Sequence, residues 1–251
     1  MREIFTINAD IIKSKIHDSI LDRFKKSFIA SGSINQYLNK AVDCFYHNAD
    51  PLGVVCDISC KQFKSIYRGD GCNEQETPLD DILNKEPTCA LFSITIGSGV
   101  SLEVTDLFRR GDSLVGYLLD MISSSVVEEW ADLVTGQYLR RGATDGWLNA
   151  GDIAIRYSPG YCGWHISGQR LLHKYLNSRE IGISLTKNYC MDPLKSISGV
   201  IVGGSYAKHY FNNDYLFCRE CLNISCRERL RIASNGLRNK PPLDAWADRK
   251  R

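Results

Sequence analysis

The sequence predicts a protein of mixed α and β structure, and three observations support this prediction. Runs of β-branched and aromatic residues at 54–58, 90–96 and 200–202 are short and apolar, as buried strands are. Segments at 1–47 and 113–139 instead repeat apolar residues at the spacing of helices. The chain has 251 residues, of which 43% are hydrophobic and 24% charged, as is ordinary for a globular protein of one large or two small domains.

Composition and charge narrow the class of protein. The formal net charge is only +2, so the charge of the whole chain does not favour nucleic acid or a membrane surface as a partner. No apolar run is long enough to span a bilayer, and the first residues, MREIFTINADIIKSK, lack the apolar core of a secretion signal. The ten cysteines then favour reduced thiols over a disulfide framework. We therefore expect a cytoplasmic protein.

The N-terminal part of the chain is expected to be helical. Residues 1–47 show two helical patterns separated by Ser31-Gly32-Ser33, and we expect residues 1–50 to form an N-terminal helical segment. This segment either covers the core or docks a partner. After the strand that follows, residues 61–89 are expected to form a loop region in which Thr77-Pro78 starts a short helix.

The rest of the chain is expected to alternate helices and strands. Gly97-Ser98-Gly99 is interpreted as a tight turn, because its glycine pattern is too incomplete for a nucleotide-binding loop. The helix at 113–139 is the longest, and a polar connection follows at 140–155. Further elements are a helix at 166–176 and strands at 181–185 and 200–202. In the helix at 166–176, the residues expected to face outward are Gln169, Arg170 and Lys174.

The stretch Arg156-Tyr157-Ser158-Pro159-Gly160-Tyr161 combines groups that suit a small charged ligand. Arg156 offers a planar fork of donors that fits a carboxylate or a phosphate. Pro159 fixes φ, and Gly160 permits φ > 0 and a close approach of a ligand to the backbone. Tyr161 offers an aromatic face to an adenine ring or a cation. Taken alone, this pattern is more typical of a solvent-facing Arg before a Pro-Gly turn.

A second block, from Leu185 to Gly199, contains Leu-Thr-x4-Met-x-Pro-x2-Ser-x-Ser-Gly. Together with Arg-x3-Gly-Tyr at 156–161, it resembles the S-adenosylmethionine-binding core of the activation (reactivation) domain of vitamin B12 (cobalamin)-dependent methionine synthase. The resemblance is strong over residues 90–211, weaker over 50–89 and absent from the first 45. It implies an α+β fold, with a curved, mainly antiparallel sheet flanked by helices, in a domain at 51–233.

The resemblance also implies a function as a methyltransferase component in methionine biosynthesis. In the family, the domain presents S-adenosylmethionine to cob(II)alamin while a flavodoxin-like or ferredoxin partner donates one electron, which yields methylcobalamin and S-adenosylhomocysteine. Such a domain positions a cationic methyl donor and needs no catalytic nucleophile or base. Because the chain is too short to hold the corrinoid, folate and homocysteine modules as well, we expect a stand-alone protein that serves a separate methionine synthase or corrinoid methyltransferase.

Matching the family pattern residue by residue implies two sets of site residues. The residues expected to bind S-adenosylmethionine are Arg156, Ser158, Gly160, Tyr161, Glu128, His209 and Tyr210. The residues expected to face the corrinoid are Met191, Lys195, Ser196 and Ser198. Glu128 would accept hydrogen bonds from the ammonium group or ribose hydroxyls of the ligand. His209 stands where the family has a contacting tyrosine, so either His209 takes over this contact or Tyr210 or Tyr206 does.

The last part of the chain carries a cysteine spacing that is typical of metal ligands. The expected ligands of a zinc ion or an iron–sulfur cluster are Cys218, Cys221, Cys226 and Cys190, with Cys162 or His209 as alternatives for the fourth. Free thiols or a labile disulfide are the other interpretation.

Two further functions stay open: a metal or iron–sulfur electron-transfer protein, and a non-catalytic S-adenosylmethionine-binding module. Residues 234–251 are expected to form an exposed basic tail.

Overall fold

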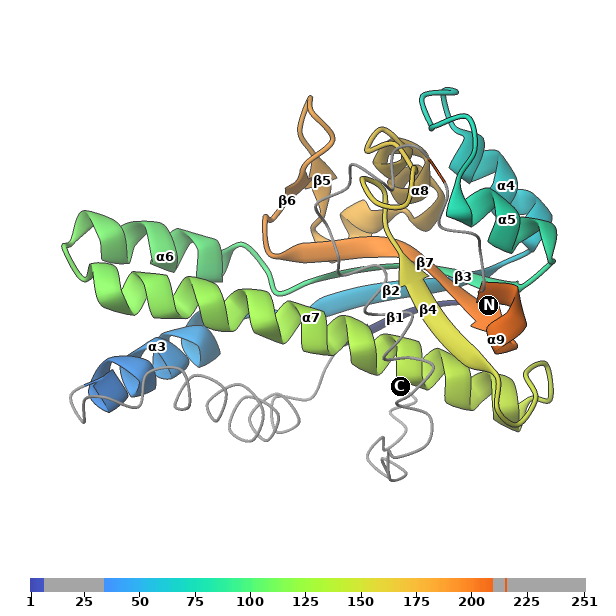
Figure 1. The fold of residues 1–251 in the computed structure, drawn as a ribbon. Coiled ribbons are helices and arrows are strands. Elements are labelled where there is room, and N and C mark those ends of the chain that lie inside the picture. The colour runs from blue at the N-terminus through green and yellow to red at the C-terminus, as the bar shows by residue number, and fades with distance from the viewer. Residues whose placement is uncertain (7–33, 210–214, 216–251) are drawn as a thin grey trace.

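The computed structural model of the chain describes residues 1–6, 34–209 and 215, and it confirms an α+β fold built on an antiparallel sheet (Figure 1). Five strands lie in the order β1-β2-β3-β7-β4, and each neighbouring pair is antiparallel. These strands are β1 (Arg2–Thr6), β2 (Leu52–Ile58), β3 (Thr88–Thr95), β7 (Ser196–Gly204) and β4 (Ile153–Tyr157). A separate two-stranded sheet pairs β5 (Ser184–Leu185) with β6 (Met191–Asp192).

Helices cover both faces of the five-stranded sheet. On one side, α7 (Ser113–Thr144) runs along the sheet, and α3 (Ile34–Asn48) and α6 (Gly99–Arg109) pack on α7 (Figure 1). The other side carries α4 (Cys60–Arg68), α5 (Pro78–Asn84), α8 (Gly168–Leu176) and the 3-10 helix η2 (Ser178–Ile181). A short helix, α9 (Tyr206–His209), follows β7. The sheet is therefore the middle layer of the described structure.

The central strand β3 separates two apolar cores. Phe92 packs with Trp130 in the core on the α7 side, whereas the neighbouring Leu91 packs with Trp164 in the core on the α8 side. Successive side chains of a strand point to opposite faces, so a strand between two helical layers is apolar on both. This explains why the four residues from Cys89 to Phe92 are all apolar and buried rather than alternating with polar residues.

Most of the predicted elements are confirmed, but the helical prediction for residues 1–47 is wrong at its start. Arg2–Thr6 forms the edge strand β1, in which Arg2 pairs with Cys56 of β2. The Arg2 guanidinium also donates a hydrogen bond of 2.9 Å to the carbonyl oxygen of Leu176. These long-range contacts, which no local pattern reveals, decide the conformation of a five-residue segment. The second helical pattern is confirmed by α3, and residues 7–33 lie outside the described part.

Two elements lie where the sequence predicts connections. The helix α4 falls within the predicted loop region at 61–89, although Ser59 and Gln62 form a capping box at its start. The strand β4 falls partly within the predicted polar connection at 140–155, and α7 extends into the same connection. A signal for α4 was present in the sequence, because its buried residues Phe63, Ile66 and Tyr67 stand at helical spacing. The strand β4 has only five residues, which is short for a pattern to show. The predicted strand at 181–185 is shorter, because its first residue belongs to η2.

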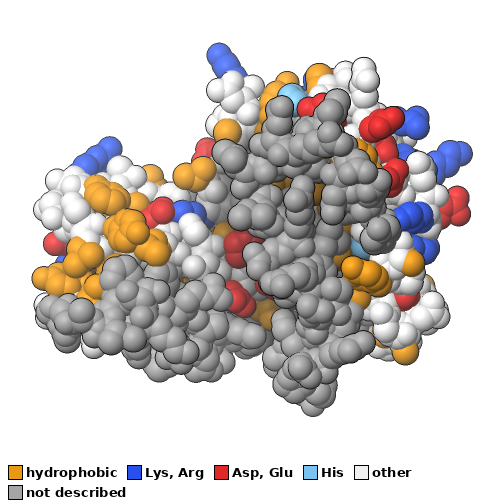
Figure 2. All heavy atoms as spheres, in the orientation of Figure 1, with side chains coloured by type: hydrophobic (Ala, Val, Ile, Leu, Met, Phe, Trp, Pro, Cys, Tyr) orange, Lys and Arg blue, Asp and Glu red, His pale blue; other side chains and the backbone are white. Residues whose placement is uncertain are grey.

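Exposed apolar side chains gather at the end of the molecule formed by α6 and the start of α7 (Figure 2). The large ones are Leu102, Phe108, Leu114 and Tyr117. The opposite side of α6 buries Val100 and Leu107 in the core, so this helix is apolar on more than one face. Among the helices of the described residues, none combines the length and the apolar character that a membrane span requires.

Candidate functional site

A cavity of about 480 Å³ lies beside α7 and α8, at the edge of the sheet where β4 ends. The predicted site residues that line it are Glu128, Arg156, Ser158, Tyr161, Met191, Ser196 and Ser198. Pro159, Ile166, Gln169 and Ile197 complete the lining. The volume falls within the usual range for small-molecule sites. Residues from both sequence blocks, and from the helix that precedes them, therefore meet at one place.

The cavity lies beside the first residues of β7, which β4 does not reach. The last residue pair between these strands is Tyr157 with Val200, so the segment Ser196–Gly199 is paired with β3 but not with β4. At Gly199, next to the last residue pair, the two strands approach so closely that a Cβ would lie 2.2 Å from the carbonyl oxygen of Tyr157. The glycine that ends the second sequence block thus allows the two strands to cross closely beside the cavity wall.

The turn after β4 gives the cavity its aromatic side. Gly160 has φ of 93°, which favours glycine, and its N–H donates a 2.7 Å hydrogen bond to the carbonyl oxygen of Trp164. The Trp164 N–H in turn donates to the carbonyl oxygen of Tyr161 at 3.0 Å. These bonds close the turn and leave the Tyr161 ring exposed along the cavity. Gly160 shapes this turn, although it does not line the cavity itself.

Arg156 is the buried charge of the site. Its side chain is 8% exposed, whereas those of Glu128 and Asp132 on α7 are 64% and 65% exposed. Nη2 of Arg156 lies 2.7 Å from Asp132 Oδ1 and 3.5 Å from Glu128 Oε2. Because both contacts use Nη2, Nε and Nη1 have no partner among the described residues, and each is free to donate a hydrogen bond to a ligand. The three charges sum to −1, which favours a ligand of net positive charge.

Gln169 lines the cavity. It was predicted to lie on the outer side of its helix, and this prediction is wrong. Its side chain is buried on α8 and accepts a hydrogen bond of 2.6 Å from Ser198 Oγ. A signal for its burial was present in the sequence. Gln169 shares one helical face with Leu172, His173 and Leu176, and these residues are also buried. Asp132, the nearest partner of Arg156, was likewise missed.

Lys195 does not line the cavity, although it was predicted to face the corrinoid. Its ammonium group lies 2.7 Å from Asp120 Oδ1 and donates a 2.8 Å hydrogen bond to Ser124 Oγ, and both partners belong to α7. The next residue, Ser196, donates from Oγ to the carbonyl oxygen of Pro193 at 2.6 Å. Lys195 therefore anchors the segment between β6 and β7 to α7, while Ser196 and Met191 reach the cavity.

His209 is not brought to the cavity either. It is buried at α9, and its Nδ1 lies 3.4 Å from the hydroxyl oxygen of Tyr157. Tyr157 belongs to the α8-side core, whereas its neighbour Arg156 points to α7, because successive side chains of β4 alternate. The predicted ligand contact of His209 therefore disagrees with its placement. Tyr210 lies outside the described residues, and Tyr206 is exposed on α9.

The predicted metal site is largely outside the described part of the chain. Cys218, Cys221 and Cys226 are not among the described residues. Cys190 is exposed, and Cys162 is half-buried next to the turn after β4. Within the ranges 1–6 and 34–209, no group of three His, Cys, Asp or Glu side chains is arranged to hold a metal ion. Metal binding by the tail stays a prediction.

Acid is expected to destabilise the fold through two buried histidines. Burial lowers the pKa of both His173 and His209 from 6.5 to about 4. The unfolded chain therefore binds protons that the folded chain does not, so this stability is complete above pH 6.5 and is lost as pH falls toward 4. Each histidine is expected to remove about 2 kcal/mol from the free energy of unfolding at pH 5.

Urea unfolding at pH 7 and pH 5 measures this loss. The variant His173→Leu should show a smaller difference between the two pH values than the wild type, while the variant of an exposed histidine, His47→Gln, should keep the wild-type difference. If His173→Leu showed the same difference between pH 7 and pH 5 as the wild type, protonation of His173 would not destabilise the folded chain, and this prediction would be wrong.

Comparisons with known proteins agree with the fold. A family model described as the activation domain of vitamin B12 dependent methionine synthase matches residues 71–216, which is more than half of the chain and includes every cavity-lining residue. A crystal structure described as the MetH reactivation domain bound to AdoHcy is similar in fold, with a TM-score of 0.55 and 14% sequence identity. The likeness covers 86% of this chain and 80% of that chain. A sequence comparison with curated proteins finds no match.

Proposed function

Since the chain belongs to the family of vitamin B12-dependent methionine synthase activation domains, we propose that its cavity binds S-adenosylmethionine and presents the methyl group to a corrinoid-binding partner. The observation that carries this proposal is the convergence of Arg156, Tyr161, Met191 and Ser198, from two separate sequence blocks, on one cavity. The similar crystal structure holds AdoHcy, the product that remains when S-adenosylmethionine loses its methyl group.

The charges of the cavity support this ligand. S-adenosylmethionine carries a sulfonium, an ammonium and a carboxylate group, so its net charge is positive. Arg156 would donate to the carboxylate from Nη1, which the carboxylates of α7 leave free, and Glu128 would attract the ammonium group from the exposed end of the same charge cluster. The net negative charge of Arg156, Glu128 and Asp132 together complements the net positive charge of the ligand.

The other side of the cavity supports a flat, largely neutral group. Tyr161, Ile166, Met191 and Ile197 line it with apolar surface, and Gln169 and Ser198 add neutral polar groups. An adenine ring suits this surface, because an aromatic face and aliphatic side chains bind a π system while a few polar groups orient it. The ligand would therefore lie with its amino-acid end toward α7 and its adenosine toward α8.

The reaction requires the protein to position the methyl donor, and it requires no acid or base from the protein. The corrinoid of the partner would supply the metal that accepts the methyl group. The residues of this chain would hold the donor at one angle and keep its carboxylate and ammonium groups paired, which removes freedom that the free ligand has. Lys195, anchored to Asp120, would hold the segment between β6 and β7 in place while the partner docks beside the exposed Leu194.

Transfer of a labelled methyl group tests the proposal. The purified chain would be mixed under anaerobic conditions with a cob(II)alamin-loaded methionine synthase that lacks its own activation domain, reduced flavodoxin and S-adenosylmethionine labelled in the methyl group. We expect label on the corrinoid and release of S-adenosylhomocysteine only when the chain is present. Ligand binding without transfer would identify a non-catalytic binding module. An absence of ligand binding, with the partner present, would contradict the proposal.

A further inference from the structure

Gln169 is held by two hydrogen bonds that converge on one atom. Its side chain is 4% exposed, and its Oε1 lies 2.6 Å from Ser198 Oγ and 3.0 Å from His173 Nε2. Ser198 comes from β7, and His173 lies one turn further along α8. The amide is therefore fixed from the sheet and from its own helix at once, at the cavity wall.

The donors around this atom determine which end of the amide faces the cavity. With Oε1 between Ser198 and His173, the hydroxyl proton and the ring proton on Nε2 both have an acceptor. If the amide were reversed, the ring proton would have to sit on Nδ1 of His173, which is buried and has no hydrogen-bond partner in the described part of the chain. Ser198 would also need another acceptor for its proton, and Oγ has none among the described residues. Buried donors without partners are rare and costly, so the first arrangement is favoured.

The protonation state of His173 agrees with this arrangement. Burial lowers the pKa of His173 to about 4, so its ring is neutral near pH 7 and carries one proton. When the ring proton of His173 is on its Nε2, its Nδ1 is an acceptor without a partner among the described residues. An unpaired buried acceptor costs less than an unpaired buried N–H in the same position. Oε1 of Gln169 thus has two donors, and Nε2 of Gln169, which has no acceptor among the described residues, offers its protons to the cavity.

We propose that the Gln169 amide donates a hydrogen bond to a ring nitrogen of the adenine of the S-adenosyl ligand, and that Ser198 and His173 position this amide. The proposal rests on the proposed function. The carboxylate of the ligand is better served by Arg156, because hydrogen bonds between charged groups are about twice as strong as neutral ones. Beside Gln169 the lining is uncharged, and the adenine acceptors N1, N3 and N7 fit a donor that cannot act as an acceptor. The amide therefore selects the base rather than the amino-acid end.

Calorimetric titration of S-adenosylhomocysteine and its 1-deaza, 3-deaza and 7-deaza analogues tests this contact. Each analogue replaces one ring nitrogen by a C–H group. We expect one of the three to bind the wild type roughly 10- to 100-fold more weakly than the parent ligand. In Gln169→Leu the parent ligand should be weakened by a similar factor, and the same analogue should show no further loss. Lys174→Leu, on the exposed side of α8, is the control and should behave as the wild type.

The outcomes separate this inference from the proposed function. Wild-type binding that Gln169→Leu leaves unchanged, or equal losses for every analogue in both proteins, would overturn the contact and leave the proposed function standing. No binding by the wild type, with the corrinoid partner present, would overturn both. A measurement without ligand checks the positioning: nitrogen NMR of His173 at pH 7 should show the proton on Nε2. A proton on Nδ1 would mean that the amide is reversed and would overturn the inference even if Gln169→Leu fails to fold.

Discussion

Replacing Arg156 by alanine is expected to weaken the binding of S-adenosylhomocysteine by about 100-fold, because the ligand carboxylate would lose its buried, positively charged hydrogen-bond donor. The fold should survive the change. Glu128 and Asp132, which lose their partner, are mostly exposed and stay hydrated, so the free energy of unfolding should fall by no more than about 1 kcal/mol. Calorimetric titration and urea unfolding of the same samples measure the two effects.

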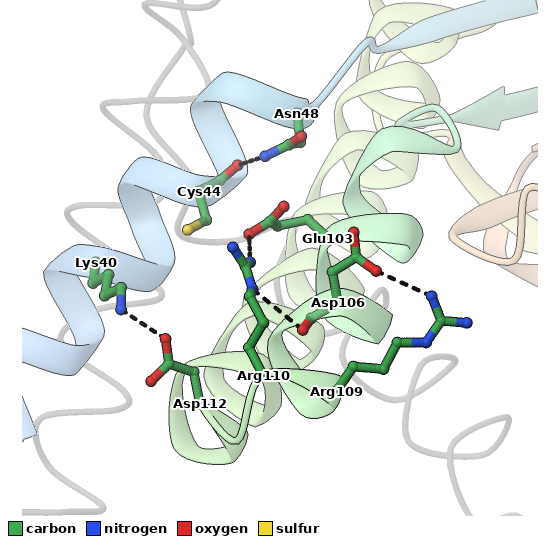
Figure 3. Close-up of polar contacts among 8 residues, drawn as sticks. All are labelled: Lys40, Cys44, Asn48, Glu103, Asp106, Arg109, Arg110 and Asp112. Atoms are coloured by element: carbon green, nitrogen blue, oxygen red, sulfur yellow. Dashed lines mark hydrogen bonds and ion pairs between the residues drawn. The ribbon is translucent and has the colours of Figure 1, made fainter.

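Arg110→Ala provides a matched control for this variant. Arg110 also pairs with a carboxylate, that of Glu103 at 2.7 Å, and it lies at the end of α6, where its contacts with Glu103 and Asp106 stay within one helix (Figure 3). No cavity-lining residue belongs to α3 or α6. Arg110→Ala should therefore keep the affinity of the wild type. If both variants lost affinity equally, the loss would reflect a general effect of net charge rather than a contact of Arg156.

Replacing Gly199 by alanine is expected to lower the free energy of unfolding by about 3 kcal/mol and to abolish ligand binding. The added Cβ would lie 2.2 Å from the carbonyl oxygen of Tyr157 and 3.0 Å from Ser158 Oγ. The hydroxyl of Ser158 can rotate away, but the carbonyl of Tyr157 belongs to the backbone of β4. The strand can avoid the clash only by moving from β7, which would displace Arg156 and the turn that carries Tyr161.

Gly136→Ala is the control for this second variant. Gly136 lies in the interior of α7, and a Cβ at this position would meet nothing within 4 Å beyond the nearby backbone of its own helix, as far as the described residues go. Alanine is the better helix former, so Gly136→Ala should raise the free energy of unfolding by about 0.5–1 kcal/mol. Wild-type stability and binding in Gly199→Ala would show that β4 and β7 do not approach as closely as described.

The sequence predicts those site residues that stand close together along the chain. Arg156, Gly160 and Tyr161 stand in one turn, where each residue type has a direct physical use, and the resemblance adds Glu128 and Ser198. Gln169 and Asp132 are different, because nothing in their own neighbourhood states that they face a cavity. Their role depends on how α8 and α7 pack on the sheet, which is a long-range property.

The elements of the fold also differ in whether their local sequence predicts them. The strand β3 and the helix α7 are long and strongly apolar, so local periodicity identifies them. The edge strands β1 and β4 have five residues each and are stabilised by pairing with β2 and β7. His209 marks a further limit, because counting along the resemblance placed it at the ligand, whereas α9 turns it into the core beside Tyr157.

The claim that Arg156 binds the carboxylate of the ligand can be tested by one thermodynamic cycle. S-adenosylhomocysteine and an analogue that lacks its carboxylate would be titrated by calorimetry into the wild type and Arg156→Ala. We expect removal of the carboxylate to weaken wild-type binding about 100-fold and to change binding to Arg156→Ala little, because the partner is already gone. Equal losses in both proteins would place the carboxylate elsewhere and would contradict the proposed orientation of the ligand in the cavity.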